Sequence, residues 1–323
     1  MSRWSRALAG RRREVVLAGA TLVPLALAAV LARGFFAPAH VRDLAVGAAL
    51  LALPALGLAV VLRAGEIDLS LGGQVAAGTA LAAGLAAAGG PFPIAFIAVV
   101  TLTCLVGAVN AALVAHLRVP APLGTLAVGL VLREAARWLA PADTAGPQVG
   151  FRFVRESPWL AGAIVVGGAI ALVLTAERSG DRIAAHVGRA ARGKRAPAGK
   201  AARGKDASPA TRAFVLAGAL AGASACFSAA GTPDVTARAT AGFDLDLLAT
   251  ALLAGALAPR ATRLHARVAT LLAATALGAC EALLRFLGAP SAWVPLMEGA
   301  IVLGAACLSA PSPWARTVRE QGA

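Results

Sequence analysis

Four polar side chains follow Arg63 within a short stretch of this sequence, RAGEIDLSLGGQVAAG at residues 63–78, which is otherwise apolar. They are Glu66, Asp68, Ser70 and Gln74. Carboxylate, hydroxyl and amide groups can bind a hydroxyl-rich or ionic ligand, and the glycine pair after Leu71 permits a broken helix with exposed N-terminal amides. The alternative is a tight turn at a membrane surface, with Asp68 as the N-cap of the next helix. The residues alone leave both interpretations open.

Two more polar residues lie inside long apolar runs. Asn110, in LVGAVNAALVAHL, either hydrogen-bonds a neighbouring helix or lines a polar cavity, and the packing role is favoured. Thr125, in PLGTLAVGL, is expected to bond back to its own helix. Arg133 and Glu134, with Arg137 at helical spacing, mark the expected outer end of that run and are interpreted as a snorkelling interfacial cluster.

No group of residues in the sequence predicts catalysis. There is no nucleophile elbow, no P-loop and no metal box, and the cysteines and histidines are scattered singly. We therefore expect no enzymatic activity, no cofactor and no metal site. Nucleic-acid binding is also disfavoured despite the net charge of +14, because the basic residues lie between apolar runs rather than on one face with aromatics.

The composition predicts that membrane-spanning helices position these residues. Of the 323 residues, 59% are hydrophobic and only 14% are charged, which is far from the balance of a soluble domain. A helix needs about 20 mostly apolar residues to cross the hydrocarbon core. The apolar runs therefore predict an all-α polytopic membrane protein of about ten transmembrane helices. The expected spans are 15–32, 44–62, 70–90, 93–117, 121–140, 159–176, 212–230, 244–258, 266–288 and 292–309.

The basic residues predict how these spans are oriented. With the N-terminus in the cytosol, 22 of the 30 Lys and Arg fall in inside segments and six in outside segments. Both termini are therefore expected to be cytoplasmic. The expected regions are a basic N-terminus (1–14), helices one to six (15–176), a basic cytoplasmic loop (177–211), helices seven to ten (212–309) and a C-terminal tail (310–323).

A short signature of alternating Leu occurs twice in the chain. Asp68-Leu69-Ser70-Leu71 is repeated as Asp244-Leu245-Asp246-Leu247. In the predicted topology the first copy faces the cytosol and the second faces the outside. This arrangement is typical of the inverted repeats that are common in transporters.

These stretches resemble those of one family in order and spacing, over roughly residues 40–309. Residues 65–72, GEIDLSLG, are similar to the GGIDLSVGS signature of ribose/xylose-type ABC sugar permeases, the inner-membrane translocators. Residues 243–255 line up without gaps against that family's YELDAIAAVVLGG segment. Further matching positions, in the segment between these two, are Asn110, Pro120, Thr125, Leu126 and Arg133.

The resemblance implies a permease subunit of an ABC importer in the bacterial inner (plasma) membrane. Its implied partners are cytosolic ABC ATPase subunits, a second permease subunit in a homo- or heterodimer, an extracytoplasmic substrate-binding protein and the lipid bilayer. The implied cargo is a small polar solute, above all a monosaccharide, although nucleoside and branched-chain amino-acid permeases share the architecture. The expected substrate path comprises Glu66, Asp68, Ser70, Gln74, Asn110 and Thr125.

The resemblance also implies a coupling helix for the ATPase within 180–192, and here the sequence departs from the family. The family's coupling segment survives only at Gly180, Arg182, Ile183, Ala185 and Gly188, with Arg189 following. A second Gly-rich stretch of the family is replaced by residues 256–260, ALAPR. The alternative expectation is therefore a divergent, transport-inactive subunit that scaffolds a competent permease.

Overall fold

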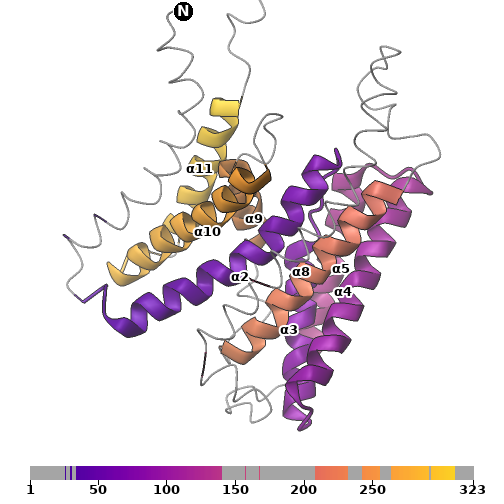
Figure 1. Ribbon diagram of the computed structural model, residues 1–323, viewed down its shortest axis with the longest axis horizontal. Helices are drawn as coiled ribbons and strands as arrows, with labels where there is room; N and C mark the ends of the chain where they lie inside the picture. The colour runs from indigo at the N-terminus through magenta and orange to yellow at the C-terminus, as the bar shows by residue number, and fades with distance from the viewer. Residues whose placement is uncertain are drawn as a thin grey trace, which may run out of the picture.

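The computed structural model describes residues 34–139, 208–231, 242–254, 263–290 and 292–309, with a few isolated positions besides. These residues form eight helices and no strand, which confirms the all-α class (Figure 1). The helices are α2 (Pro38–Arg63), α3 (Leu71–Ala87), α4 (Phe92–Ala115), α5 (Ala121–Leu139), α8 (Ser208–Gly231), α9 (Phe243–Leu253), α10 (Arg263–Phe286) and α11 (Trp293–Ser309). Each lies on one of the predicted spans, and the predicted spans 15–32 and 159–176 lie outside the described residues.

The helices differ in how far they can reach across a bilayer. Stretches of α2, α4, α8 and α10 are long and apolar enough to cross one, with mean hydropathies of 1.4 to 2.4. By contrast α3 has 17 residues and α9 has 11. At about 1.5 Å per residue these two helices extend about 26 Å and about 17 Å, less than the roughly 30 Å hydrocarbon core. The predicted spans 70–90 and 244–258 are therefore longer than the helices that form there.

Glycines in the left-handed conformation end α2 and begin α9. Gly65 follows the last turn of α2 with φ 86°, and the next residue, Glu66, donates its N–H to the Val61 carbonyl at 3.2 Å. A glycine at this position stops a helix and reverses the chain. The residues after Gly65 are thereby turned back among the helices, which buries Asp68 and Ser70.

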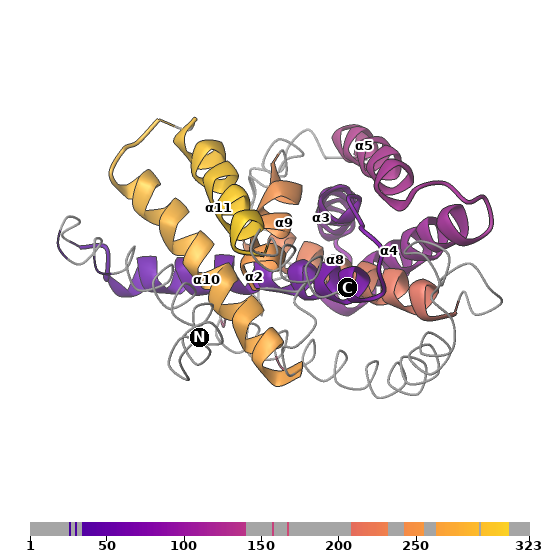
Figure 2. The same ribbon diagram turned by 90° about the horizontal axis from the view of Figure 1, so that it is seen from above.

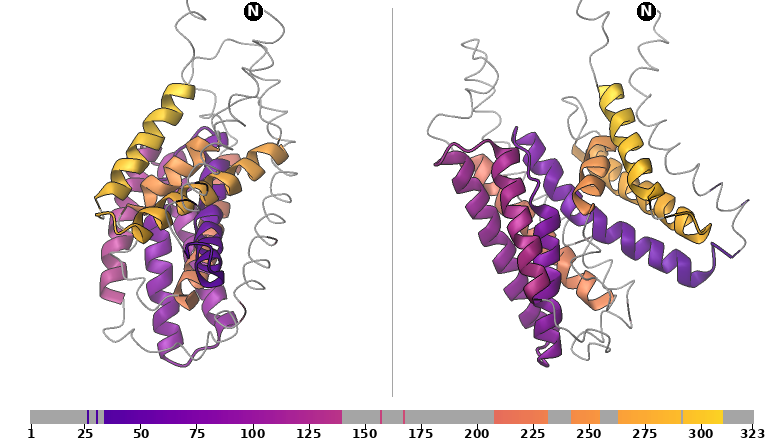
Figure 3. Two further views of the ribbon diagram at one scale, coloured as in Figure 1. Left: turned by 90° about the vertical axis from the view of Figure 1, so that its left-hand side faces the viewer. Right: turned by 180° about the vertical axis from the view of Figure 1, so that it is seen from behind.

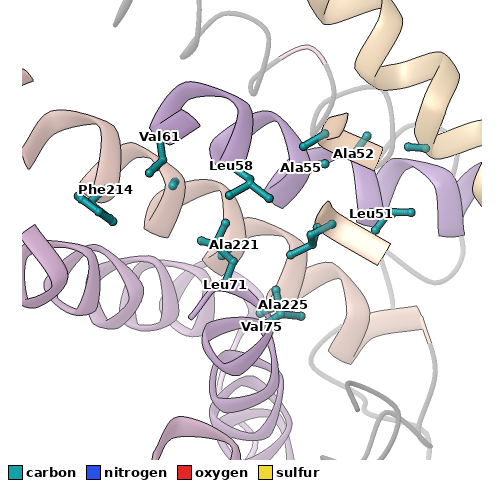
Figure 4. Close-up of a cluster of buried hydrophobic side chains, with 14 of the residues drawn as sticks. Leu51, Ala52, Ala55, Leu58, Val61, Leu71, Val75, Phe214, Ala221 and Ala225 are labelled. Atoms are coloured by element: carbon teal, nitrogen blue, oxygen red, sulfur yellow. The ribbon is translucent and has the colours of Figure 1, made fainter. Parts of the chain in front are cut away.

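Two glycines allow α4 and α8 to touch along their backbones. A Cβ on Gly107 of α4 would collide with the Phe214 carbonyl, and one on Gly218 of α8 would collide with the Thr103 carbonyl. Small residues give membrane helices this close approach. Beside this seam, larger side chains fill the core, among them Leu58 of α2 and Leu71 of α3 (Figure 4).

The main helix contacts follow an internal repeat in which α2, α3, α4 and α5 correspond to α8, α9, α10 and α11. α8 packs against α3 and α4, and its counterpart α2 packs against α9 and α10. α5 covers α3, and α11 covers α9. Helices that correspond to each other in the two copies are also in contact, namely α2 with α8 and α3 with α9. In the predicted topology four spans lie between each helix and its counterpart, so the counterpart crosses the membrane in the opposite direction and the second copy is inverted.

The repeat places α3 at the centre of one group of helices. Seen from above, α3 stands nearly end-on with α4, α5, α8 and α9 around it (Figure 2). α2 runs from this group to the group of α9, α10 and α11 (Figure 3). The connection from α2 to α3 therefore enters the protein where the two copies of the repeat meet.

Candidate functional site

The connection from α2 to α3 is held by a buried turn around Asp68. The Asp68 Oδ1 accepts hydrogen bonds from the backbone N–H of Ser70 at 2.8 Å and from the Ser70 hydroxyl at 2.6 Å. The N-cap residue of α3 is Ser70. The expectation that Asp68 itself is the N-cap is thus wrong by two residues, because its side chain closes the turn before the helix.

The Ser70 hydroxyl joins two further side chains to this turn. It accepts a hydrogen bond from Gln74 Nε2 at 2.8 Å, within α3, and another from Asn110 Nδ2 of α4 at 2.7 Å. With one bond donated and two accepted, the hydroxyl is fully used. We call Asp68, Ser70, Gln74 and Asn110 the Ser70 cluster; all four are at most 2% exposed.

Three oxygen atoms of the Ser70 cluster have no partner among the described residues. They are Asp68 Oδ2, Gln74 Oε1 and Asn110 Oδ1. Buried polar atoms are nearly always hydrogen-bonded, and leaving one unsatisfied is destabilising. All three atoms are acceptors, so the cluster is complementary to a ligand that supplies hydrogen-bond donors.

Thr125 ties α5 to the same connection. Its hydroxyl donates to the Ala121 carbonyl of its own helix at 2.8 Å, as predicted, and also accepts the Leu69 N–H at 2.9 Å. Next to it, a Cβ on Gly129 would lie only 2.9 Å from the Leu69 carbonyl. The backbone of α5 thus rests directly on the segment that carries Asp68.

A charged pair connects the two copies of the repeat at the start of α3. Arg133 of α5 forms an ion pair with Asp244 of α9, whose other oxygen accepts the Gly72 N–H at 2.8 Å. The two side chains are only 20% and 18% exposed. The interpretation of Arg133 as a snorkelling residue is therefore wrong, because a partner far along the chain holds it inside the protein.

The same contact brings together the two copies of the repeated signature. Asp244, in the second copy, is hydrogen-bonded to Gly72, which directly follows the first copy. The two copies of the signature therefore meet inside the protein. Glu134 and Arg137 do pair with each other in exposed positions, at 3.0 Å.

The remaining predicted site residues lie apart from this cluster. Glu66 is half-buried, and burial raises the pKa of its carboxyl group. Its side chain makes no hydrogen bond to the Ser70 cluster. The expected coupling residues Gly180, Arg182, Ile183, Ala185, Gly188 and Arg189 all lie outside the described residues.

The structure also gathers a set of acidic residues that the sequence analysis missed. Asp246 of α9, Glu281 of α10 and Glu298 of α11 each place a carboxylate oxygen within 4.8 Å of the others. They are separated along the chain, so no local spacing indicates them. The signal that could have found two of them is the internal repeat. Asp246 takes the place of Ser70 in the repeated signature, and Glu281 is the nineteenth residue of α10 as Asn110 is of α4.

Comparison with known proteins supports the family resemblance. Residues 41–176 match the family model described as branched-chain amino acid transport system / permease component. The match takes in α2 to α5 and with them the Ser70 cluster and Thr125. No curated protein and no solved structure matches the chain. Through residues 41–176, the chain is similar to the permease components of ABC transporters in the inner-membrane translocator family.

Proposed function

We propose that this permease imports a small hydroxyl-rich solute, a monosaccharide, by way of the Ser70 cluster. The observation that carries the proposal is the set of three buried acceptors without partners, Asp68 Oδ2, Gln74 Oε1 and Asn110 Oδ1. Sugar hydroxyls are donors, and each could satisfy one of these atoms. The short helices α3 and α9, which meet at the repeat interface, are the kind of element that forms transporter sites.

The hydrogen bonds already made at the start of α3 favour a sugar over an amino acid. An amino acid also needs donors for its carboxylate, and helix N-terminal amides commonly supply them. Here Asp68 already accepts the Ser70 N–H, and Asp244 already accepts the Gly72 N–H. The free polar atoms are acceptors, so a zwitterion would set its carboxylate against other oxygens.

The proposed transport cycle requires the Ser70 cluster to open. Its four side chains are closed off from solvent in this conformation. Opening would be driven by a separate ATPase subunit that docks at Gly188 and Arg189, with solute delivered by an extracytoplasmic binding protein. A second permease subunit would complete the assembly, in a bacterial inner membrane with both termini in the cytoplasm.

The first test asks whether the chain works with an ATPase at all. The protein is purified from cells that co-express its neighbouring genes, and the co-purifying subunits are identified. We expect an ATPase subunit, whose recovery falls when Gly188 and Arg189 are substituted. A chain recovered alone, or only with another permease, would instead favour a transport-inactive scaffold.

The second test addresses the solute. The assembled transporter is reconstituted in liposomes, and uptake of labelled monosaccharides, nucleosides and leucine is compared. We expect uptake of a monosaccharide, strongly reduced in Asn110→Leu and unchanged in Thr275→Val, whose hydroxyl only bonds back to Leu271 in its own helix. Uptake of leucine without sugar uptake would contradict the proposal.

A further inference from the structure

The start of α3 is occupied by a carboxylate that comes from the other copy of the repeat. Asp244 of α9 accepts the Gly72 N–H at 2.8 Å through Oδ1, and its Oδ2 pairs with the guanidinium of Arg133. Gly72 is the second residue of α3, whose N-cap is Ser70, so its N–H is one of those that have no partner within the helix. Helix N-terminal amides and arginine side chains are typical ligands of free anions. Here a side chain of the protein takes the place of such an anion.

Gly72 and α5 shape the space in which the Asp244 carboxylate lies. A Cβ on Gly72 would collide with Asp244 Oδ1, so only glycine lets the carboxylate come this close to the helix. Arg133 follows Gly129 by one turn of α5, and Gly129 rests on the Leu69 carbonyl. The guanidinium is thereby fixed beside the first turn of α3.

Asp244 does not use the whole of the Arg133 guanidinium. The Nε of Arg133, which lies outside the Ser70 cluster, is buried and has no partner among the described residues. A carboxylate that is free to turn can accept hydrogen bonds from two nitrogens of one guanidinium. Asp244 gives Arg133 only one oxygen, because the other is held by the Gly72 N–H. A free carboxylate would therefore bind well here if Asp244 were absent.

The place of Asp244 bears on the solutes that can reach the Ser70 cluster. Asp68 and Asp244 accept the N–H groups of Ser70 and Gly72, so both carboxylates lie at the same end of α3. A solute carboxylate at this end would meet two negative charges and would find both amides already bonded. Like charges that are brought together away from water repel each other strongly.

We propose that Asp244 is a specificity-determining residue, whose carboxylate fills an anion-binding site formed by Arg133 and the Gly72 N–H and so excludes solutes that carry a carboxylate. The excluded class comprises sugar acids and amino acids, whereas neutral sugars are admitted. The inference rests on the proposed path through the Ser70 cluster. It goes further by assigning the selection to one side chain outside that cluster, in the second copy of the repeat.

The first test asks whether the site accepts a free carboxylate once Asp244 is truncated. The wild type and Asp244→Ala are purified as full chains in detergent, and Tm is measured in mixtures of formate and the bulkier pivalate at constant ionic strength. Asp244→Ala should have a lower Tm than the wild type, and formate should raise it by a few degrees and saturably, because formate replaces the lost carboxylate. The wild type should not respond. Equal responses of the two proteins, or no response of Asp244→Ala, would overturn the proposal.

Two further variants show whether formate binds at Arg133. Asp244→Ala combined with Arg133→Leu should not respond to formate, because the guanidinium is gone. Glu134→Ala removes an exposed carboxylate, which pairs with Arg137 at 3.0 Å, and should not acquire a response. A response of Glu134→Ala as large as that of Asp244→Ala would place formate on the protein surface and overturn the site.

The second test measures the selection itself, with Asp244→Asn. This variant keeps the size of the side chain and an acceptor for the Gly72 N–H, so it tests the proposal even if Asp244→Ala does not fold. Uptake of the transported monosaccharide into liposomes is compared with uptake of the acid in which one terminal carbon of the same sugar is oxidised to a carboxylate. The ratio of acid uptake to sugar uptake should rise by about tenfold in Asp244→Asn, because one repelling charge is gone. An unchanged ratio would overturn the role of Asp244 in selection.

The two tests separate this inference from the proposed function. If the wild type imports no sugar, the proposed function and the selection of solutes fail together, while the formate response still shows whether Asp244 fills an anion site. Sugar uptake by the wild type, with no formate response in Asp244→Ala, would overturn this inference alone.

Discussion

At the scale of single residues, the Ser70 hydroxyl is the point on which the Ser70 cluster depends. It makes three hydrogen bonds, to Asp68, Gln74 and Asn110, in a site closed to water. Ser70→Ala should therefore lower the free energy of unfolding by roughly 3 kcal/mol, since it leaves buried amide groups without an acceptor. Unfolding in mixed micelles, followed by tryptophan fluorescence, measures the change.

A matched control is Ser224→Ala in α8. Ser224 is also fully buried, but its hydroxyl makes a single bond, to the Leu50 carbonyl at 2.7 Å. That substitution should lower the free energy of unfolding by about 1 kcal/mol. If the two variants were equally stable, Ser70 would have no special position in the cluster.

The pair of Arg133 and Asp244 provides a second test at this scale. Removing one partner from a largely buried ion pair leaves an uncompensated charge, so Arg133→Leu or Asp244→Leu should each lower the free energy of unfolding by about 3 kcal/mol. The double variant should recover part of this loss. A double-mutant cycle measures the coupling, and the exposed pair of Glu134 and Arg137 should show about 0.5 kcal/mol or less. A coupling energy for Arg133 and Asp244 no larger than that of the exposed pair would contradict this account.

Residue types indicated the polar positions, but not all of their partners. The back-bond of Thr125 was predictable because it joins residues four apart on one helix. The inward position of Arg133 was not, because it depends on Asp244, which is far away in the sequence. The group of Asp246, Glu281 and Glu298 was missed because its members lie far apart in the sequence.

At the scale of helices, the close seam between α4 and α8 makes a prediction about glycine. Gly218→Ala would push a methyl group into the Thr103 carbonyl, so the helices must separate. We expect the free energy of unfolding to fall by about 2 kcal/mol, as for other overpacked sites. The control is Gly84→Ala in α3, where a Cβ meets nothing within 4 Å and the change should be neutral or slightly stabilising. Equal effects of the two substitutions would mean that the seam is looser than the contacts indicate.

The apolar runs predicted the positions of these helices well and their lengths less well. Hydropathy follows side chains, and residues 88–90 and 255–258 contain no charged or polar side chain that would end an apolar run. α3 ends at Ala87, and Gly89 follows it with a positive φ, a backbone feature that hydropathy does not register. The short α3 and α9 were therefore predicted as full spans.

At the scale of the whole molecule, the inverted repeat predicts where corresponding loops lie. The connection from α4 to α5 and the connection from α10 to α11 are counterparts, so they should face opposite sides of the membrane. Leu117 and Leu287 are exposed in these connections. In a background without the four native cysteines, Leu287→Cys should react with an impermeant maleimide added outside the cell, and Leu117→Cys should react only after lysis. Labelling of both from the same side would contradict the inverted arrangement.

The repeat was predictable only from its four-residue signature. That signature indicated which helices correspond, but it did not indicate that the two copies touch. Contacts between distant segments, such as Asp244 with Gly72, were needed to bring the two copies together.

The first helix of each copy of the repeat packs against the other copy: α2 contacts α9 and α10, and α8 contacts α3 and α4. This arrangement has a consequence for how the protein is synthesised. α8 fills the space beside α3 and α4, yet it is synthesised after them and after the long stretch from 140 to 207. Until α8 emerges from the ribosome, the glycine face of α4 and the side of α3 that α8 covers lack the helix that packs against them in the described part of the chain. The first half must therefore wait in the bilayer, incompletely packed, and the step that completes it is the insertion of one late helix.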